Sequence, residues 1–172
     1  MSAGFARFGP GPRYTIPEGG FCISSFAILR KRGKVLLVKP NRHEKWLQEW
    51  APDLGIFEGE RLEKQLRSWR FPSTYVKQGE APDDALRRVV RDQLDVKAYA
   101  VTSSRFYNFY DPSTFFPGKM HWDYCFVYGI SAPGEVHSKP WFSAVEYVQV
   151  SKLRPEDFGS AQGDLAKALR LM

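Results

Sequence analysis

The sequence predicts an α/β/α sandwich in which helices pack on both faces of a mixed sheet. Strand-like apolar segments come in groups, with stretches of helical periodicity between and after them. The length of 172 residues suits one domain. A composition of 43% hydrophobic and 26% charged residues is typical of a folded globule. No apolar run approaches the roughly 18 residues that span a bilayer, so we expect a cytoplasmic protein without a membrane partner.

The first part of the domain is predicted to be a hairpin. Phe21–Leu29 is an apolar strand, the turn at 31–34 contains glycine, and Val35–Lys39 is the returning strand. Residues 1–20 are rich in Gly and Pro and lack the apolar core of a signal peptide. We therefore expect an extended arm over 1–20 and a single domain over 21–172.

The segment 41–70 is predicted to be an insertion before the central helix. Pro and Gly interrupt its first part, and Gly59–Trp69 has helical periodicity, with Leu62 and Leu66 on one face. A short extended piece, Tyr75–Lys77, follows it.

The second half is predicted to begin with the strongest helix of the chain, from Pro82 to Leu94. Pro82 suits its first turn, and Asp83 and Asp84 complement the positive end of the helix dipole. Leu86, Val90 and Leu94 form its apolar stripe. The remaining elements are predicted to be strands over 96–108, 122–130 and 146–150 and a closing helix over 164–171.

The two cysteines, Cys22 and Cys125, both fall in apolar strand-like runs. No zinc-type Cys/His spacing is present, so we expect two buried free thiols in a reducing compartment. The net charge of +6 favours anionic ligands such as nucleotides, other phosphates or RNA. A basic solvated surface would give the same charge, and both interpretations stay open.

The stretch 71–96 carries the chemical motif of the chain. It contains Gly79-Glu80-Ala81-Pro82, and Arg88 follows Glu80 after seven residues, with Val90, Asp92 and Val96 next. This order resembles the Nudix signature: Gly, five residues, Glu, seven residues, then Arg-Glu-apolar-x-Glu-Glu-x-Gly-apolar. The lead-in Trp69-x-Phe71-Pro72 and the segment from His121 to Tyr128 are also similar to the family, so the resemblance covers about residues 20 to 170.

The resemblance implies a Nudix fold and a pyrophosphohydrolase that cleaves a nucleoside diphosphate linked to another group. It places Glu80, Arg88, Asp92 and Gln93 at catalytic positions, with Glu80 and Asp92 as ligands of Mg²⁺ or Mn²⁺. Two alternatives stay open. Glu80 and Arg88 would also serve as an ion pair that locks the loop to the helix, and Asp92 would also serve as a solvated carboxylate.

Four positions depart from the signature. Thr74 takes the place of the first Gly, Val89 and Gln93 each take the place of a Glu, and Asp95 takes the place of the late Gly. We expect positions 89, 92 and 93 to share a helix face opposite the core stripe, which leaves one carboxylate there. Hydrolysis is therefore expected to be weak or lost, and Glu at positions 89 and 93 to rebuild a metal site.

A second group of candidate residues follows the helix. His121 and Asp123 alternate along a strand, so they share a face as an acid/base pair or as a polar strand end. Phe115 and Phe116 lie in a loop rich in Pro and Gly and are candidate substrate contacts. We expect the ligand pocket between the 79–94 element and the loop from Tyr110 to Trp122.

Two other functions stay open beside hydrolysis. One is an inactive Nudix-fold module that binds a nucleotide or RNA, with aromatic side chains stacking on bases. The other is a protein-interaction subunit in which Trp46 and Trp50 of the 41–70 segment are anchors.

Overall fold

The computed structural model describes residues 17–113, 116–160 and 162–172, so most of the expected arm lies outside the described residues. Its six strands form one mixed sheet in the order β4-β5-β1-β2-β6, and β3 pairs with β1 outside this path. β1 and β5 are parallel, whereas the other strand pairs are antiparallel. The predicted mixed sheet is confirmed. The strands are β1 (Phe21–Lys31), β2 (Lys34–Pro40), β3 (Ser73–Tyr75), β4 (Ala100–Pro112), β5 (Met120–Ser131) and β6 (Phe142–Val148).

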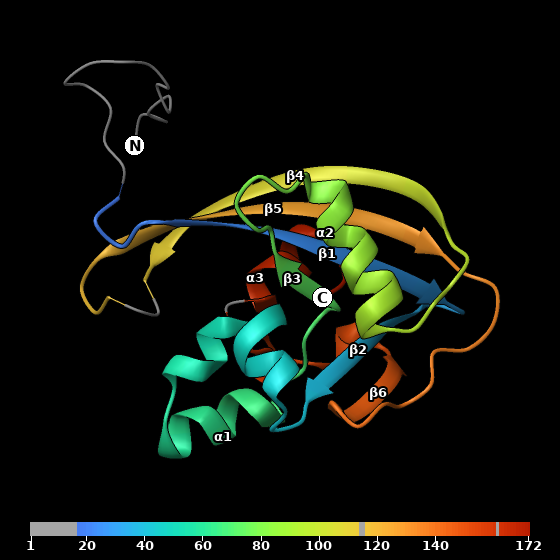
Figure 1. Ribbon diagram of the computed structural model, residues 1–172, viewed down its shortest axis with the longest axis horizontal. Helices are drawn as coiled ribbons and strands as arrows, with labels where there is room; N and C mark the ends of the chain where they lie inside the picture. Colours follow the sequence, from blue (N-terminus) through green and yellow to red (C-terminus); the bar gives the residue numbers. More distant parts are fainter. Residues whose placement is uncertain (1–16, 114–115, 161) are drawn as a thin grey trace.

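Helices cover both faces of the sheet, as the sandwich prediction requires (Figure 1). The α-helices are α1 (Gly59–Arg67), α2 (Pro82–Arg88) and α3 (Gln162–Ala168). Two π-helical segments, η1 (Lys45–Trp50) and η3 (Val89–Gln93), and three 3₁₀ segments, η2 (Pro52–Ile56), η4 (Val150–Lys152) and η5 (Pro155–Asp157), complete the described elements. None of the described helices is both long and apolar enough to cross a lipid bilayer.

The central strand β1 divides the core into two clusters, because successive side chains of a strand point to opposite faces. Ala27 and Leu29 belong to the first cluster, which also contains Leu86 of α2. Phe26 and Ile28 belong to the second, together with Leu165 of α3. We call these the α2 face and the α3 face of the sheet.

The 41–70 segment adds a thick apolar layer on the α2 face. Trp46 and Trp50 are each 1% exposed, and their ring centroids lie 5.4 Å apart. Nε1 of Trp46 donates to the carbonyl oxygen of Trp141 at 2.6 Å. Both tryptophans are therefore core residues, and neither is available at the surface as the anchor that the protein-interaction alternative offered.

Candidate functional site

The loop and helix of the signature adopt the backbone that the motif requires. Gly79 has a φ of 78°, in the left-handed region that favours glycine, and Pro82 lies in the first turn of α2. Asp95, at the family's late Gly, has a φ of 56°. Asp is one of the side chains that tolerates this region best, and its carboxylate pairs with Lys139. Asp95 therefore adopts the left-handed backbone conformation at the position where the signature has Gly.

Glu80 and Arg88 form a two-pronged ion pair across the loop–helix joint. Nε of Arg88 donates to Oε1 of Glu80 at 2.6 Å, and Nη2 donates to Oε2 at 2.7 Å. Oε2 also accepts from the backbone N–H of Lys77, and Nη2 also donates to the carbonyl oxygen of Tyr75. The hydrogen bonds from Arg88 hold the pKa of Glu80 below its usual value. A metal ion bound at Glu80 would have to displace the two hydrogen bonds from Arg88.

The expectation that Val89 and Gln93 lie opposite the core is wrong, because both side chains are fully buried. In an ideal α-helix, Gln93 would lie within about 20° of the direction of Leu86, seven residues earlier, and so on the core side. Val89 belongs to the same core cluster as Trp46 and Trp50. The 41–70 segment thus turns this side of the helix into core, and only Asp92 of the three positions stays exposed.

Gln93 is held in place by its surroundings. Its side-chain Nε2 donates to the backbone carbonyl oxygen of Ser73 at 3.1 Å. Its backbone carbonyl oxygen accepts from Nε1 of Trp141 at 2.9 Å. Its Oε1 is buried and has no hydrogen-bond partner in the described part of the chain. The side chain therefore bridges the helix to β3 inside the protein, away from solvent.

The divalent cation implied by the family resemblance does not fit this helix. Mg²⁺ takes hard oxygen ligands and several waters. Of the signature positions 89, 92 and 93, only Asp92 is an exposed carboxylate, and the oxygens of Glu80 in the loop are occupied by Arg88. Among the described residues, the single cluster of three or more His, Cys, Asp or Glu side chains with suitably close ligand atoms contains neither of them.

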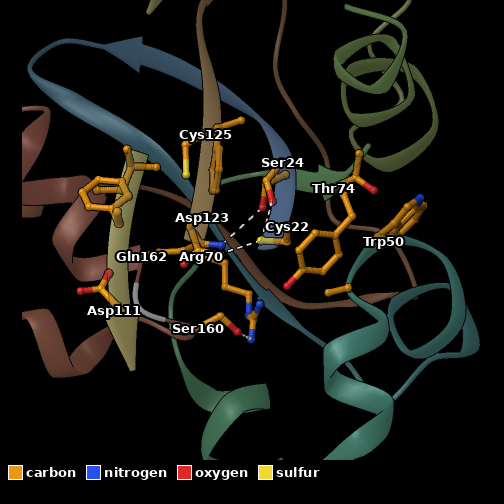
Figure 2. Close-up of a pocket in the computed structure, with 16 residues that line it drawn as sticks. Cys22, Ser24, Trp50, Arg70, Thr74, Asp111, Asp123, Cys125, Ser160 and Gln162 are labelled. Atoms are coloured by element: carbon orange, nitrogen blue, oxygen red, sulfur yellow. Dashed lines mark hydrogen bonds between the residues drawn. The ribbon is translucent and has the colours of Figure 1, made fainter. Parts of the chain in front are cut away.

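A polar recess opens instead on the α3 face, between β1, β3, β4, β5 and the start of α3 (Figure 2). Its volume of about 60 Å³ is room for about four to six water molecules. The helix does not line this recess, which therefore lies apart from the pocket expected between the 79–94 element and the loop from Tyr110 to Trp122. Its polar walls include Cys22, Ser24, Thr74, Asp111, Asp123 and Gln162, and its aromatic walls include Phe26, Trp50, Tyr75 and Phe109.

Charged groups of both signs meet in the recess. The guanidinium of Arg70, 3% exposed, donates through Nη2 to Oε1 of Gln65 at 2.8 Å and to Oγ of Ser160 at 2.9 Å. Burial raises the pKa of Asp111, and the nearby carboxylates of Asp164 and Asp123 raise it further. The acidic side of the recess therefore favours a ligand that brings positive charge or hydrogen-bond donors.

His121 and Asp123 come together with Cys22 beside this recess. Nε2 of His121 lies 3.2 Å from Oδ1 of Asp123, so the expectation that they share a strand face is confirmed. The thiol of Cys22 donates to the same Oδ1 at 2.7 Å. Burial raises the pKa of this thiol strongly, and the charge of Asp123 raises it further.

Cys22 is the member of this cluster that sequence spacing did not reveal. It lies 101 residues from Asp123 in the chain, and only the parallel pairing of β1 with β5 places the two in register. The one local signal was a polar alternation, Cys22 and Ser24, inside an apolar strand. Of the other candidates, Phe116 is 56% exposed and away from the recess, and Phe115 lies outside the described residues.

No family model matches this sequence, and no curated protein matches it. Solved structures do resemble it. The MutT protein from Methanosarcina mazei Go1 superposes with a TM-score of 0.60 at 13% identity, over 89% of this chain and 95% of that one. The ORF135 protein of E. coli gives 0.55 at 16% identity, over 87% and 89%. A UDP-X diphosphatase gives 0.53 at 12% identity, over 92% of this chain but 62% of its own.

These three proteins share one architecture with this chain, that of the Nudix superfamily. The chain has the Nudix fold. The resemblance that the motif of residues 71–96 suggested is thereby confirmed at the level of the fold.

Proposed function

We propose that this protein binds a nucleoside diphosphate derivative through the recess on the α3 face, and that it does not hydrolyse this ligand through the Nudix helix. The observation that carries the proposal is that the motif side of the helix is buried, whereas a polar recess lies on the opposite, α3 face of the sheet. The side of the helix that holds carboxylates in the signature is core here, because Val89 and Gln93 are fully buried. The polar recess is on the other face.

The recess suits one planar polar ring better than a complete nucleotide. Room for about four to six waters is comparable with a single heterocycle. Phe26 and Phe109 offer apolar contact, and Asp111 and Gln162 offer hydrogen-bonding groups for ring or ribose substituents. In this arrangement the phosphates stay outside, where the net charge of +6 favours them.

A panel of nucleoside diphosphate sugars, ADP-ribose and short RNA is expected to separate the candidate ligands by thermal shift at low salt. A ligand at 100 times its Kd adds about 2.7 kcal/mol, which for a domain of this size raises Tm by roughly 5 to 10 °C. Raising the salt concentration should reduce the shift. A response to RNA alone would favour the RNA-binding alternative, and no response at all would contradict the proposal.

Phe109→Leu is expected to reduce the ligand-induced shift, because it removes a ring from the recess while keeping apolar volume. Phe106→Leu is the matched control: it changes the same residue type on the same strand, but Phe106 points to the α2 face and contacts Phe126. Equal loss in both variants would place the ligand elsewhere.

The same panel with Mg²⁺ or Mn²⁺ tests hydrolysis. We expect no metal-dependent release of phosphate products that depends on Asp92. Turnover that disappears in Asp92→Ala would restore the helix as a catalytic site and make pyrophosphohydrolysis the function.

A further inference from the structure

Three side chains with different metal-binding atoms converge where β1 and β5 run side by side. The sulfur of Cys22, Nε2 of His121 and Oδ1 of Asp123 all lie within 4.8 Å of one another. A tetrahedral zinc ion, with bonds of about 2.0 to 2.3 Å, sets its ligand atoms roughly 3.5 Å apart. Small side-chain adjustments would therefore bring all three atoms into the coordination shell of one ion.

The backbone arranges this cluster in advance. Cys22 and Asp123 are direct partners in the parallel β1–β5 pairing, and His121 precedes Asp123 on the same face of β5. The sheet therefore fixes all three Cβ positions without help from a loop. Preorganisation of this kind is what a metal site needs if the ion is to bind a folded protein without a large rearrangement.

The imidazole of His121 is oriented by the chain in the manner of a metal ligand. Its Nδ1 lies 2.7 Å from the carbonyl oxygen of Gly19, and this atom can only accept, so Nδ1 carries a proton. Nε2 then faces Oδ1 of Asp123 at 3.2 Å. A backbone carbonyl on the far ring nitrogen is a common support of metal-bound histidine.

We propose that Cys22, His121 and Asp123 bind one zinc-class divalent cation, with its remaining coordination position open toward the recess. Thiolate and imidazole select Zn²⁺ or Co²⁺ over Mg²⁺. This site is separate from the helix carboxylates that the Nudix signature implies. When the ion binds, the sulfur–metal bond replaces the thiol S–H bond, and the thiol proton leaves to solvent.

The surroundings supply an entry path and additional negative charge. Cys22 and Asp123 both line the recess (Figure 2), so an ion that enters the recess reaches them. Asp111 also lines the recess and pairs directly with His121 across the β4–β5 ladder. A carboxylate at this position is suited to hold a metal-bound water. The inference does not require the proposed nucleotide ligand, because it concerns the ion alone.

Titration of the natural protein with Co²⁺, without any nucleotide, tests the site. We expect one equivalent to bind, with visible bands of tetrahedral cobalt and a near-ultraviolet band from thiolate-to-metal charge transfer. Cys22→Ser should abolish the charge-transfer band. Cys125→Ser is the matched control, since Cys125 lies two residues beyond Asp123 on β5, and it should keep the band. Zn²⁺ should raise Tm, whereas Mg²⁺ should not.

A second variant keeps the test possible if Cys22→Ser misfolds. If circular dichroism shows that Cys22→Ser does not fold, His121→Gln is titrated instead, and the affinity for Co²⁺ should fall at least about tenfold. Absence of the charge-transfer band in the natural protein would overturn the assignment. So would a band that survives in Cys22→Ser or one that disappears in Cys125→Ser. None of these three results depends on whether a nucleotide binds.

Discussion

Val89→Glu is expected to unfold the domain or to leave it only marginally folded. Val89 is fully buried in the core of the α2 face. Burial of an unpaired carboxylate costs several kcal/mol, which is comparable with the roughly 5 to 15 kcal/mol that stabilises a whole domain. Urea denaturation followed by circular dichroism measures the loss.

Arg91→Glu is the matched control for this substitution. It introduces the same side chain on the same helix, but at an exposed position, where a change is usually within about 0.5 kcal/mol. A Val89→Glu protein as stable as Arg91→Glu would contradict the burial of this helix face. The same reasoning applies to Gln93→Glu, so the double variant that restores both signature acids should lose its fold and should not gain a metal site.

Arg88→Met is expected to destabilise the domain by about 2 to 4 kcal/mol. Removal of one member of a buried ion pair costs about 3 to 5 kcal/mol, and the value here is lower because the side chains of Arg88 and Glu80 keep 15% and 14% exposure. Arg87→Met is the control, since Arg87 is 52% exposed and pairs with Asp84 at the surface, where a pair contributes about 0 to 1 kcal/mol. Similar losses of stability in both variants would show that the ion pair between Glu80 and Arg88 does not stabilise the domain more than a surface pair does.

Lowering the pH should reduce the difference in unfolding free energy between the natural protein and Arg88→Met. The pKa of Glu80 is lowered in the folded state from a usual value of 4.5. A group of this kind contributes its stability above the unfolded pKa and loses it as pH falls through the folded pKa. The difference in unfolding free energy between the two proteins should therefore be full at about pH 7 and should shrink as pH falls below 4.5.

The sequence was sufficient for elements whose pattern is local. The hairpin from β1 to β2 was predicted because a glycine turn separates two apolar runs, and α2 because proline, two aspartates and an apolar stripe mark its start and its buried face. The order of Gly79, Glu80 and Arg88 then indicated the family. These signals depend on neighbours within a few residues, so they do not require knowledge of tertiary packing.

The site was less predictable because two of its features depend on distant segments. Val89 belongs to one core cluster with Trp46 and Trp50, which lie about 40 residues earlier in the chain. Helix periodicity alone shows only that Gln93 belongs beside Leu86. The contact between Cys22 and Asp123 exists because β1 and β5 pair in parallel, across a separation of 101 residues.

Calorimetric titration with Mn²⁺ of the natural protein and of Asp92→Ala tests the central claim most directly. That claim is that the Nudix helix of this protein is a structural element rather than a metal site. Asp92 is its one exposed carboxylate among the signature positions 89, 92 and 93, and its removal should leave stability nearly unchanged. We expect the two isotherms to superimpose. Tight Mn²⁺ binding by the natural protein that is lost in Asp92→Ala would contradict the account.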